Sequence, residues 1–178
     1  EVRSFDQYYD SKEAFEEVYE SIAREIIDLA RDNDIVYAVP GHPRVAESTV
    51  GLIEKYALEE GIDIEIIPSM SFIDAMYNYL GFDPADGFRL LDAFTMDKVN
   101  LNDQANIIVT QVYDRYIASN VKLALMEYYQ DDQEVWIVSG AGVKGLERKT
   151  RLALYDLDSQ DNEFDHLTSV YIPKSDAR

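Results

Sequence analysis

A run of apolar residues that breaks directly into a turn of proline and glycine most constrains the fold of this chain. Residues 35–39 are apolar and lie between turn formers, which is typical of a parallel strand covered on both faces. The turn Pro-Gly-His-Pro follows at 40–43, and Pro43 suits the first position of a helix because an N–H there has no intrahelical partner. A strand end, a glycine turn and a helix start, in this order, build a ligand crevice in open α/β sheets. The sequence therefore predicts a crevice at Gly41, where no side chain blocks a ligand.

The first 81 residues continue this alternation of helices and strands. An amphipathic helix is expected over 12–31, ahead of the strand at 35–39, and a second helix from 43 to about 60. A further strand at 62–67 and a helix from 71 to about 80 complete the pattern. Such short spacing predicts a parallel sheet with crossover helices in an N-terminal lobe, 1–81.

The pattern changes after residue 81. Residues 82–104 are short apolar pieces among Pro, Gly, Asp and Asn, and we expect them to link two lobes. The C-terminal lobe, 105–178, has predicted strands at 106–112, 134–138, 150–157 and 168–172, a helix at 118–129 and a glycine-rich turn at 140–145. Its last strands follow one another without long helices between them, which indicates a mixed sheet with antiparallel pairs. The predicted class is two-lobed α/β.

Composition narrows the range of partners and compartments. Sixteen basic and thirty-five acidic residues give a net charge of -19, which disfavours nucleic acid and anionic membranes as partners. The absence of cysteine excludes disulfides, thiolate metal sites and a cysteine nucleophile. We find no signal peptide and no apolar run of the ~18–20 residues that span a bilayer, so a cytoplasmic location is expected. Because the chain begins with Glu1 rather than methionine, we expect it to be a piece of a longer protein.

Two turns are the strongest candidates for chemistry. The second, Ile66-Ile67-Pro68-Ser69-Met70-Ser71-Phe72, also follows a predicted strand. Ser71 is equally explained as a helix N-cap with Asp74 as its capping-box partner. The alternative for the first turn is a tight strand-to-helix connection with His42 exposed. Taken together the two turns favour a binding site, because adjacent parallel strands bring their carboxyl ends to one crevice.

Three other patterns carry less weight. Glu16, Glu17 and Glu20 share one helix face and could bind Mg²⁺, but they lie opposite the apolar stripe and no second helix has a matching acidic pair, so a solvated face is favoured. No serine stands in a Gly-x-Ser-x-Gly elbow beside His42 or His166, which disfavours a serine hydrolase. The turn 140–145 lacks the Gly-Lys-Ser/Thr ending of an ATP-binding loop and is better interpreted as a wall of a binding site. No metal site is predicted.

The order of three segments resembles the tetrapyrrole (corrin/porphyrin) methylases. They are Val39-Pro-Gly-His-Pro43, Ile67-Pro-Ser-Met-Ser-Phe72 and Ile107-Ile-Val-Thr-Gln-Val-Tyr113, continued by the helix 121–127 and the strand 167–173. The resemblance covers essentially the whole chain and is closest to the methylase-like domain fused ahead of a MazG pyrophosphohydrolase in bacterial proteins. It implies a two-lobed α/β fold, a homodimer, and S-adenosylmethionine bound between the lobes through largely main-chain contacts, with S-adenosylhomocysteine as product.

Carried over by position, the resemblance implies three groups of cofactor-binding residues. They are Gly41, His42, Pro43 and Val45 at the methionine end, Ser71 and Phe72 in a second loop with Gln111 at a strand end, and Ala141, Thr168 and Ser169 on the adenine side. Two departures stand out. His42 occupies the place of the family's usual aspartate, and no Gly-x-Gly-x-Gly-type loop, with its central strand, precedes the helix at 12–31.

The implied reaction is direct displacement of a methyl group from a sulfonium to a nucleophilic carbon. It depends on alignment and exclusion of water, so no catalytic residue is predicted. The leading hypothesis is an S-adenosylmethionine-dependent methyltransferase-type domain for a small organic, tetrapyrrole-like acceptor, inactive in this stretch alone. The alternative is a non-catalytic regulatory or dimerisation module for a fused MazG nucleotide pyrophosphohydrolase. Mg²⁺-dependent nucleotide hydrolysis by Glu16, Glu17 and Glu20 ranks last.

Overall fold

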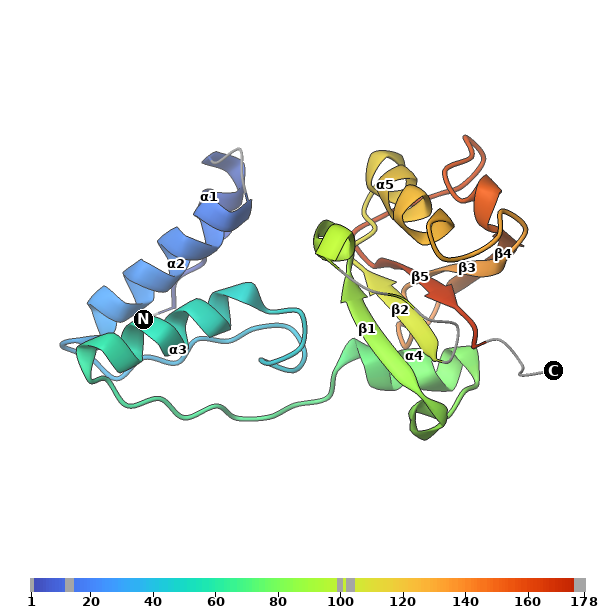
Figure 1. Ribbon diagram of the computed structural model, residues 1–178. Coiled ribbons are helices and arrows are strands. Elements are labelled where there is room, and N and C mark those ends of the chain that lie inside the picture. The colour runs from blue at the N-terminus through green and yellow to red at the C-terminus, as the bar shows by residue number, and fades with distance from the viewer. Residues whose placement is uncertain (1, 12–14, 99–100, 102–104, 175–178) are drawn as a thin grey trace. The chain divides into compact units, whose positions relative to one another are not determined.

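The chain divides into two compact units, residues 1–71 and 72–178, which are described separately (Figure 1). The computed structural model describes residues 2–11, 15–98, 101 and 105–174. The division falls between Ser71 and Phe72, ahead of the lobe boundary expected at residue 81. Helix α4 (Phe72–Leu80) accounts for the difference, because its residues Met76, Tyr79 and Leu80 pack on the sheet of the second unit.

The first unit is built on two helices that pack side by side in the same direction, with a short helix before them. These are α1 (Asp6–Ser11), α2 (Phe15–Ala30) and α3 (Ser48–Glu60). The carboxyl ends of α2 and α3 lie together, because Arg31, just after α2, pairs with Glu60, the last residue of α3, at 2.6 Å. The core of the unit lies between α2 and α3, and its apolar residues recur along each helix at helical spacing. They are Val18, Ile22, Ala23, Ile26 and Ile27 of α2 and Ile53, Tyr56 and Ala57 of α3. This spacing places the apolar side chains on one face of each helix. The predicted amphipathic helix is confirmed over its described part; residues 12–14 lie outside the described residues.

Helix α3 begins later than predicted. Residues 43–47 form turns, in which the Val45 N–H donates to the His42 carbonyl oxygen at 3.0 Å, and the helix starts at Ser48. Pro43 is therefore not the first helical residue, and that prediction was wrong. The end of the helix is as expected, because Gly61 takes a left-handed conformation with φ 69°.

The two strands predicted in the first unit do not form. Residues 35–39 and 62–67 are extended, and no ladder pairs them with any described segment. A strand is held by hydrogen bonds to a neighbouring backbone, so an apolar run without such a neighbour remains a loop. The side chains show the consequence, since Val36 is 93% and Ile67 71% exposed. The predicted parallel sheet of the N-terminal lobe is therefore not present in this structure.

The second unit contains a mixed five-stranded sheet in the order β1-β2-β5-β3-β4. Its strands are β1 (Phe88–Asp92), β2 (Asn106–Thr110), β3 (Glu134–Ser139), β4 (Arg148–Ala153) and β5 (Thr168–Ile172). The pair β1–β2 is parallel, and the pairs β2–β5, β5–β3 and β3–β4 are antiparallel. The mixed sheet and the α/β class are thus confirmed. Strand β4 lies at one edge, where Arg148, Lys149 and Arg151 are exposed.

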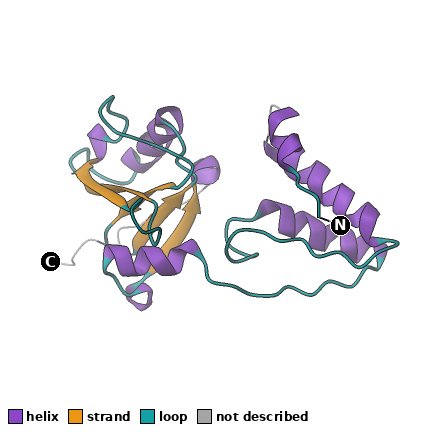
Figure 2. Cartoon of the chain, turned by 180° about the vertical axis from the view of Figure 1, so that it is seen from behind, coloured by secondary structure: helices purple, strands orange, loops and turns teal. Residues whose placement is uncertain are grey.

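Helices cover both faces of this sheet (Figures 1 and 2). Alternate residues of β2 face opposite ways, so that Ile107 and Val109 join the core beneath helix α5 (Arg115–Met126), whereas Ile108 packs on the side of α4. The Asp114 carboxylate caps α5 by accepting from the Ile117 N–H at 2.8 Å. Short 3₁₀ turns at Pro84–Asp86, Ala93–Lys98 and Leu154–Asp156 connect the remaining elements.

Predictions from the second half of the sequence agree closely with these elements. The strands expected at 106–112, 134–138 and 168–172 and the helix at 118–129 correspond to β2, β3, β5 and α5. The stretch expected at 150–157 is β4 followed by a 3₁₀ turn. Residues 82–104 differ from the expected linker, because they include β1, which pairs with β2 inside the sheet; residues 99–100 and 102–104 lie outside the described part.

Candidate functional site

The predicted cofactor-binding residues fall in both units. Gly41, His42, Pro43, Val45 and Ser71 belong to the first unit, and Phe72, Gln111, Ala141, Thr168 and Ser169 belong to the second. The two sets are therefore described one after the other.

In the first unit the structure brings the two candidate turns together. Gly41 has a φ of 85°, which favours glycine, and a Cβ built on it would lie 3.6 Å from the Met70 carbonyl oxygen. The turn at 40–43 thus lies against the segment that precedes α4, as the sequence predicts. Met70 itself is 75% exposed, and Ser71 is half-buried beside it.

His42 organises its own turn. Its Nδ1 accepts a hydrogen bond from the Arg44 N–H, two residues on, at 3.1 Å. Aspartate and asparagine form this same contact in Asx turns, so the imidazole makes here a backbone contact that is usual for those side chains. The neutral ring accepts at Nδ1 and carries its proton on Nε2. Arg44 then ties the turn to α3 through a two-pronged contact with Glu54, at 2.7 and 3.0 Å.

Glu47 adds a half-buried carboxyl group at the end of this turn. It precedes the first residue of α3, and its side chain makes no capping hydrogen bond there. Burial raises the pKa of the Glu47 carboxyl above its usual value. Pro43 and Val45 are half-buried between His42 and Glu47. The turn therefore combines an open glycine, main-chain polar groups and one shielded acid.

In the second unit the parallel strands β1 and β2 end side by side. Asp92 pairs in register with Thr110, and Gln111 follows at once with a φ of 65°. The Gln111 Nε2 donates to the Asp92 Oδ2 at 2.8 Å, and the Tyr113 hydroxyl donates to the Gln111 Oε1 at 3.0 Å. Carboxyl ends of parallel strands are the usual place for ligands in α/β sheets.

The glycine-rich turn at 140–145 is built by close packing. A Cβ on Gly140 would lie 2.5 Å from the Leu146 carbonyl oxygen, and one on Gly142 would lie 2.7 Å from the Ala75 Cβ of α4. Both glycines also have positive φ, of 64° and 81°. Ala141, between them, is half-buried and packs with the cluster on the α4 side of the sheet.

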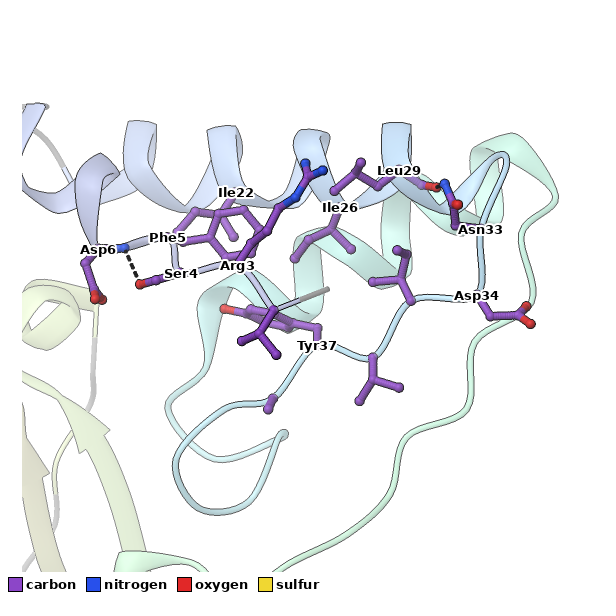
Figure 3. A pocket seen from close by; sticks show the side chains of 14 residues that line it. Arg3, Ser4, Phe5, Asp6, Ile22, Ile26, Leu29, Asn33, Asp34 and Tyr37 are labelled. Carbon is purple, nitrogen blue, oxygen red and sulfur yellow. Dashed lines mark hydrogen bonds between the residues drawn. The ribbon is translucent and has the colours of Figure 1, made fainter.

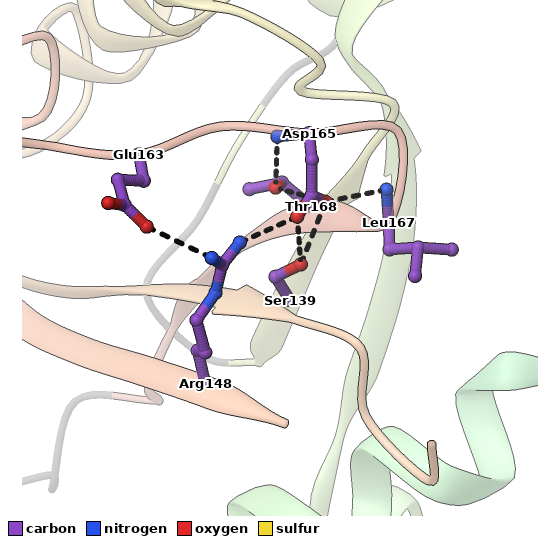
Figure 4. A network of polar contacts seen from close by, with 6 residues as sticks. All are labelled: Ser139, Arg148, Glu163, Asp165, Leu167 and Thr168. Atoms are coloured by element: carbon purple, nitrogen blue, oxygen red, sulfur yellow. Dashed lines mark hydrogen bonds and ion pairs between the residues drawn. The ribbon is translucent and has the colours of Figure 1, made fainter. Parts of the chain in front are cut away.

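Thr168 belongs to a network centred on Asp165 (Figure 4). The Asp165 carboxylate accepts hydrogen bonds from the Ser139 hydroxyl at 2.8 Å, the Leu167 N–H at 2.8 Å and the Thr168 hydroxyl at 3.0 Å. Arg148 contacts it at 2.6 Å and reaches Glu163 at 2.9 Å. Burial opposes ionisation, but these hydrogen bonds and the guanidinium together hold the pKa of Asp165 below its usual value.

This network places Thr168 and Ser169 inside the sheet. Both are buried, and the Thr168 hydroxyl also accepts from the Asp165 N–H at 2.9 Å. The Thr168 carbonyl accepts from the Val112 N–H, which ties β5 to the end of β2. In this structure the Thr168 hydroxyl is hydrogen-bonded within the end of the strand.

Sequence reasoning selected Gln111 but missed Asp92, Tyr113 and Asp165. Asp92 closes an apolar run, which is a signal for a strand end, but it stood in the segment expected to link the lobes. Asp165 stands two residues before Leu167, a spacing at which a carboxylate accepts from the following backbone N–H. That local signal could have been found in the sequence.

A further cavity lies in the first unit (Figure 3). It has a volume of about 850 Å³ and lies between residues 2–6, the inner face of α2 and residues 33–38. Phe5 and Tyr37 meet edge to face across it, with ring centroids 6.2 Å apart. None of the ten predicted cofactor-binding residues lines it.

The three acidic residues on one face of α2 are either hydrogen-bonded within the protein or exposed to solvent. The Glu20 carboxylate accepts hydrogen bonds from Arg24, at 2.7 Å, and from the Tyr56 hydroxyl, whereas Glu16 and Glu17 are exposed. Among the described residues no three His, Cys, Asp or Glu side chains gather as a metal site would require. None of the helices described is both long and apolar enough to cross a bilayer.

The sequence was compared with protein families and with known proteins. A sequence profile of the tetrapyrrole (corrin/porphyrin) methylases matches residues 2–158. The uncharacterized protein YabN of Bacillus subtilis (strain 168) is 45% identical over 172 residues, which are 97% of this chain. The chain spans only 35% of the length of that relative.

Solved structures share the fold at low sequence identity. The uroporphyrin-III C-methyltransferase of Thermus thermophilus superposes with a TM-score of 0.68 at 17% identity, over 87% of this chain and 71% of that one. The same enzyme in complex with S-adenosyl homocysteine gives a TM-score of 0.64 at 17% identity, over 87% of this chain and 73% of that one. At such identities the likeness concerns the fold alone.

Proposed function

This chain belongs to the tetrapyrrole (corrin/porphyrin) methylases, and on that premise we propose that it is an S-adenosylmethionine-dependent methyltransferase-type domain. Its acceptor is a small organic molecule of tetrapyrrole-like character, and its product from the cofactor is S-adenosylhomocysteine. The contact of Gly41 with Met70 carries the proposal, because it joins the two turns that the family resemblance assigns to the cofactor. The S-adenosyl homocysteine complex of a protein with the same fold supports the choice of cofactor.

The residues of the two turns suit a cationic cofactor. S-adenosylmethionine carries a sulfonium and an ammonium group, which carbonyl oxygens and carboxylates stabilise. The Met70 carbonyl beside Gly41 and the Glu47 carboxyl offer such groups, and the net charge of -19 attracts cations to the molecule. Gly41, His42, Pro43 and Val45 would hold the methionine end, with Ser71 and Phe72 next to it. The family resemblance also assigns Gln111, Ala141, Thr168 and Ser169 to the cofactor.

The chemistry places few demands on side chains. The bound cofactor supplies an electrophilic methyl group, and transfer to a carbon nucleophile needs alignment and exclusion of water. The protein's part is to fix the turns. His42 and Arg44 hold the first turn on α3, and the Asp165 network holds the end of β5. No general base is assigned.

Titration calorimetry tests the cofactor. We expect S-adenosylhomocysteine to bind the longer protein that contains this chain, with ATP as the control ligand that does not bind at the same site. Gly41→Val should abolish binding, because a branched side chain at φ 85° would be strained and would fill the space beside Met70. Absence of binding by the unaltered protein would remove the cofactor from the proposal.

The second candidate function is a regulatory or dimerisation module for a fused MazG pyrophosphohydrolase. The exposed apolar side chains of the first unit favour it, since Val36, Ile67 and Met70 are each at least 70% exposed and a partner surface could cover them. The homodimer implied by the family resemblance would use such a surface.

Sedimentation and hydrolysis assays separate this candidate from the first. A module without catalysis predicts that deleting residues 1–178 from the longer protein changes its oligomeric state or its nucleotide hydrolysis. It also predicts no S-adenosylhomocysteine binding and no methyl acceptor. Cofactor binding with unchanged assembly after deletion would decide for the methyltransferase.

A further inference from the structure

The end of β2 carries an unusual backbone conformation. Among the described residues only Ala46 and Gln111 have positive φ without being glycine, and Gln111, at φ 65°, directly follows a buried strand. A side chain in this region crowds its own backbone, so the conformation persists only where the surroundings enforce it.

Side-chain contacts around Gln111 supply that enforcement. Its Nε2 donates to the Asp92 Oδ2 at 2.8 Å, and its Oε1 accepts from the Tyr113 hydroxyl at 3.0 Å. Both ends of the amide are therefore engaged within the protein. The other oxygen of Asp92, Oδ1, accepts from the Phe94 N–H at 2.8 Å, which fixes the carboxylate at the end of β1.

The arrangement joins the ends of two parallel strands. Asp92 is the last residue of β1, and Gln111 stands one residue beyond β2, its parallel neighbour. A hydrogen bond to a charged carboxylate is stronger than one between neutral groups. The rings of Phe94 and Tyr113 lie 6.2 Å apart beside it, and Phe94 is 49% exposed. The two strand ends are thus joined by side-chain contacts, beside a half-exposed aromatic ring.

We propose that Asp92, acting through Gln111, is a positioning residue for the cofactor edge of the second unit, and that Gln111 serves through its backbone rather than through its amide side chain. This inference rests on the proposed methyltransferase function. Asp92 and Tyr113 are hydrogen-bonded to the two ends of the Gln111 amide. These hydrogen bonds stabilise the left-handed conformation, which presents the Gln111 backbone at the carboxyl edge of the parallel strands.

A double-mutant cycle with S-adenosylhomocysteine calorimetry tests the proposal in the longer protein. Glycine adopts positive φ without strain, so Gln111→Gly should keep the Kd within about 3-fold. Asp92→Ala should weaken binding about 10-fold, and Asp92→Asn, which can still accept from the Gln111 amide, should recover most of it. In the Gln111→Gly background, Asp92→Ala should cost less than about 2-fold, because the turn no longer needs its support.

Each outcome bears on a separate claim. Loss of binding in Gln111→Gly would show that the amide itself meets the cofactor and would overturn the backbone role. Equal weakening by Asp92→Ala in both backgrounds would show that Asp92 acts independently of Gln111, and a lowered Tm with an unchanged Kd would reduce it to a structural residue. If the unaltered protein does not bind S-adenosylhomocysteine, the proposed function fails first and the cofactor role of Asp92 fails with it.

Discussion

The two units contain apolar runs of the same kind with opposite outcomes. In the second unit, residues 106–110 form β2, every residue of which is buried between β1 and β5. In the first unit, residues 35–39 and 62–67 remain unpaired, and their side chains are largely exposed. An apolar run therefore indicates the capacity to form a strand, whereas the neighbouring backbone decides whether the strand exists.

The largest difference in the free energy of unfolding is expected between two isoleucine-to-alanine variants, one in each unit. Ile107 in β2 is fully buried, so Ile107→Ala should lower the free energy of unfolding of the second unit by about 2–5 kcal/mol. Ile67, predicted as a strand residue but 71% exposed, should change stability by less than about 0.5 kcal/mol when replaced by alanine. Urea denaturation measures both. A large effect at Ile67 would mean that its run is paired in solution.

Glycines in the two units extend the comparison. Gly142→Ala should destabilise the second unit by about 2–3 kcal/mol, because positive φ costs a side chain 1–2 kcal/mol and the new Cβ would meet Ala75 at 2.7 Å. Gly61→Ala in the first unit meets nothing within 4 Å and should cost only the conformational part, about 1 kcal/mol. Thermal unfolding of the two variants gives the difference, and equal losses would argue against the packing of the 140–145 turn on α4.

Acid sensitivity should distinguish the second unit by its Asp165 network. The pKa of Asp165 lies below its usual value, so its stabilising contribution is present above the unfolded-state pKa and is lost as the pH falls through the folded-state pKa. Asp165→Asn should therefore be less stable than the unaltered protein at pH 7, and the gap should narrow toward pH 3. Trp136, the single tryptophan, lies in β3 and reports unfolding of this unit by fluorescence.

The matched control for this measurement is Asp132, an exposed residue between α5 and β3. Asp132→Asn should leave the unfolding curve unchanged at both pH values. A pH-independent gap for Asp165→Asn would contradict the role of its ionised carboxylate.

The smallest expected effect concerns the turn at His42 in the first unit. His42→Asn should preserve the hydrogen bond to the Arg44 N–H, because asparagine accepts from the backbone two residues on. His42→Ala should lose it and make that amide exchange with solvent several-fold faster, at a cost of about 0.5–1 kcal/mol to the local turn. Amide exchange by NMR measures the rate for Arg44. Equal exchange in both variants would mean that the imidazole does not hold the turn.

Sequence reasoning succeeded where the signal was local. Strand β5, helix α4 and the glycine turn at 140–145 follow from the pattern of apolar residues and glycines alone. The neighbouring position of Gly41 and Met70 was also predicted, because turns after parallel strands share an edge. The two turns lie close together although the strands before them do not form.

The errors have two physical causes, one local and one between segments that are distant in sequence. Pro43 suits a helix start, but the hydrogen bonds of His42 with Arg44 and Val45 close a turn first and delay the helix to Ser48. Asp92 could not be predicted as a site residue, because its hydrogen-bond partner Gln111 is 19 positions away in sequence. Contacts between distant segments depend on register and strand order, and no local pattern contains that information.

Strand β4 bears on the tendency of the protein to aggregate. An edge strand presents unpaired backbone groups that can recruit a strand from another molecule. The exposed edge here carries Arg148, Lys149 and Arg151, three of the 16 basic residues of a chain with 35 acidic ones. Arg148 is paired with Glu163 and Asp165, and Arg151 with Glu134, so pairing of two copies through β4 would disturb these ion pairs and enclose Lys149. Charged side chains on an edge strand disfavour such pairing and so reduce the tendency to aggregate.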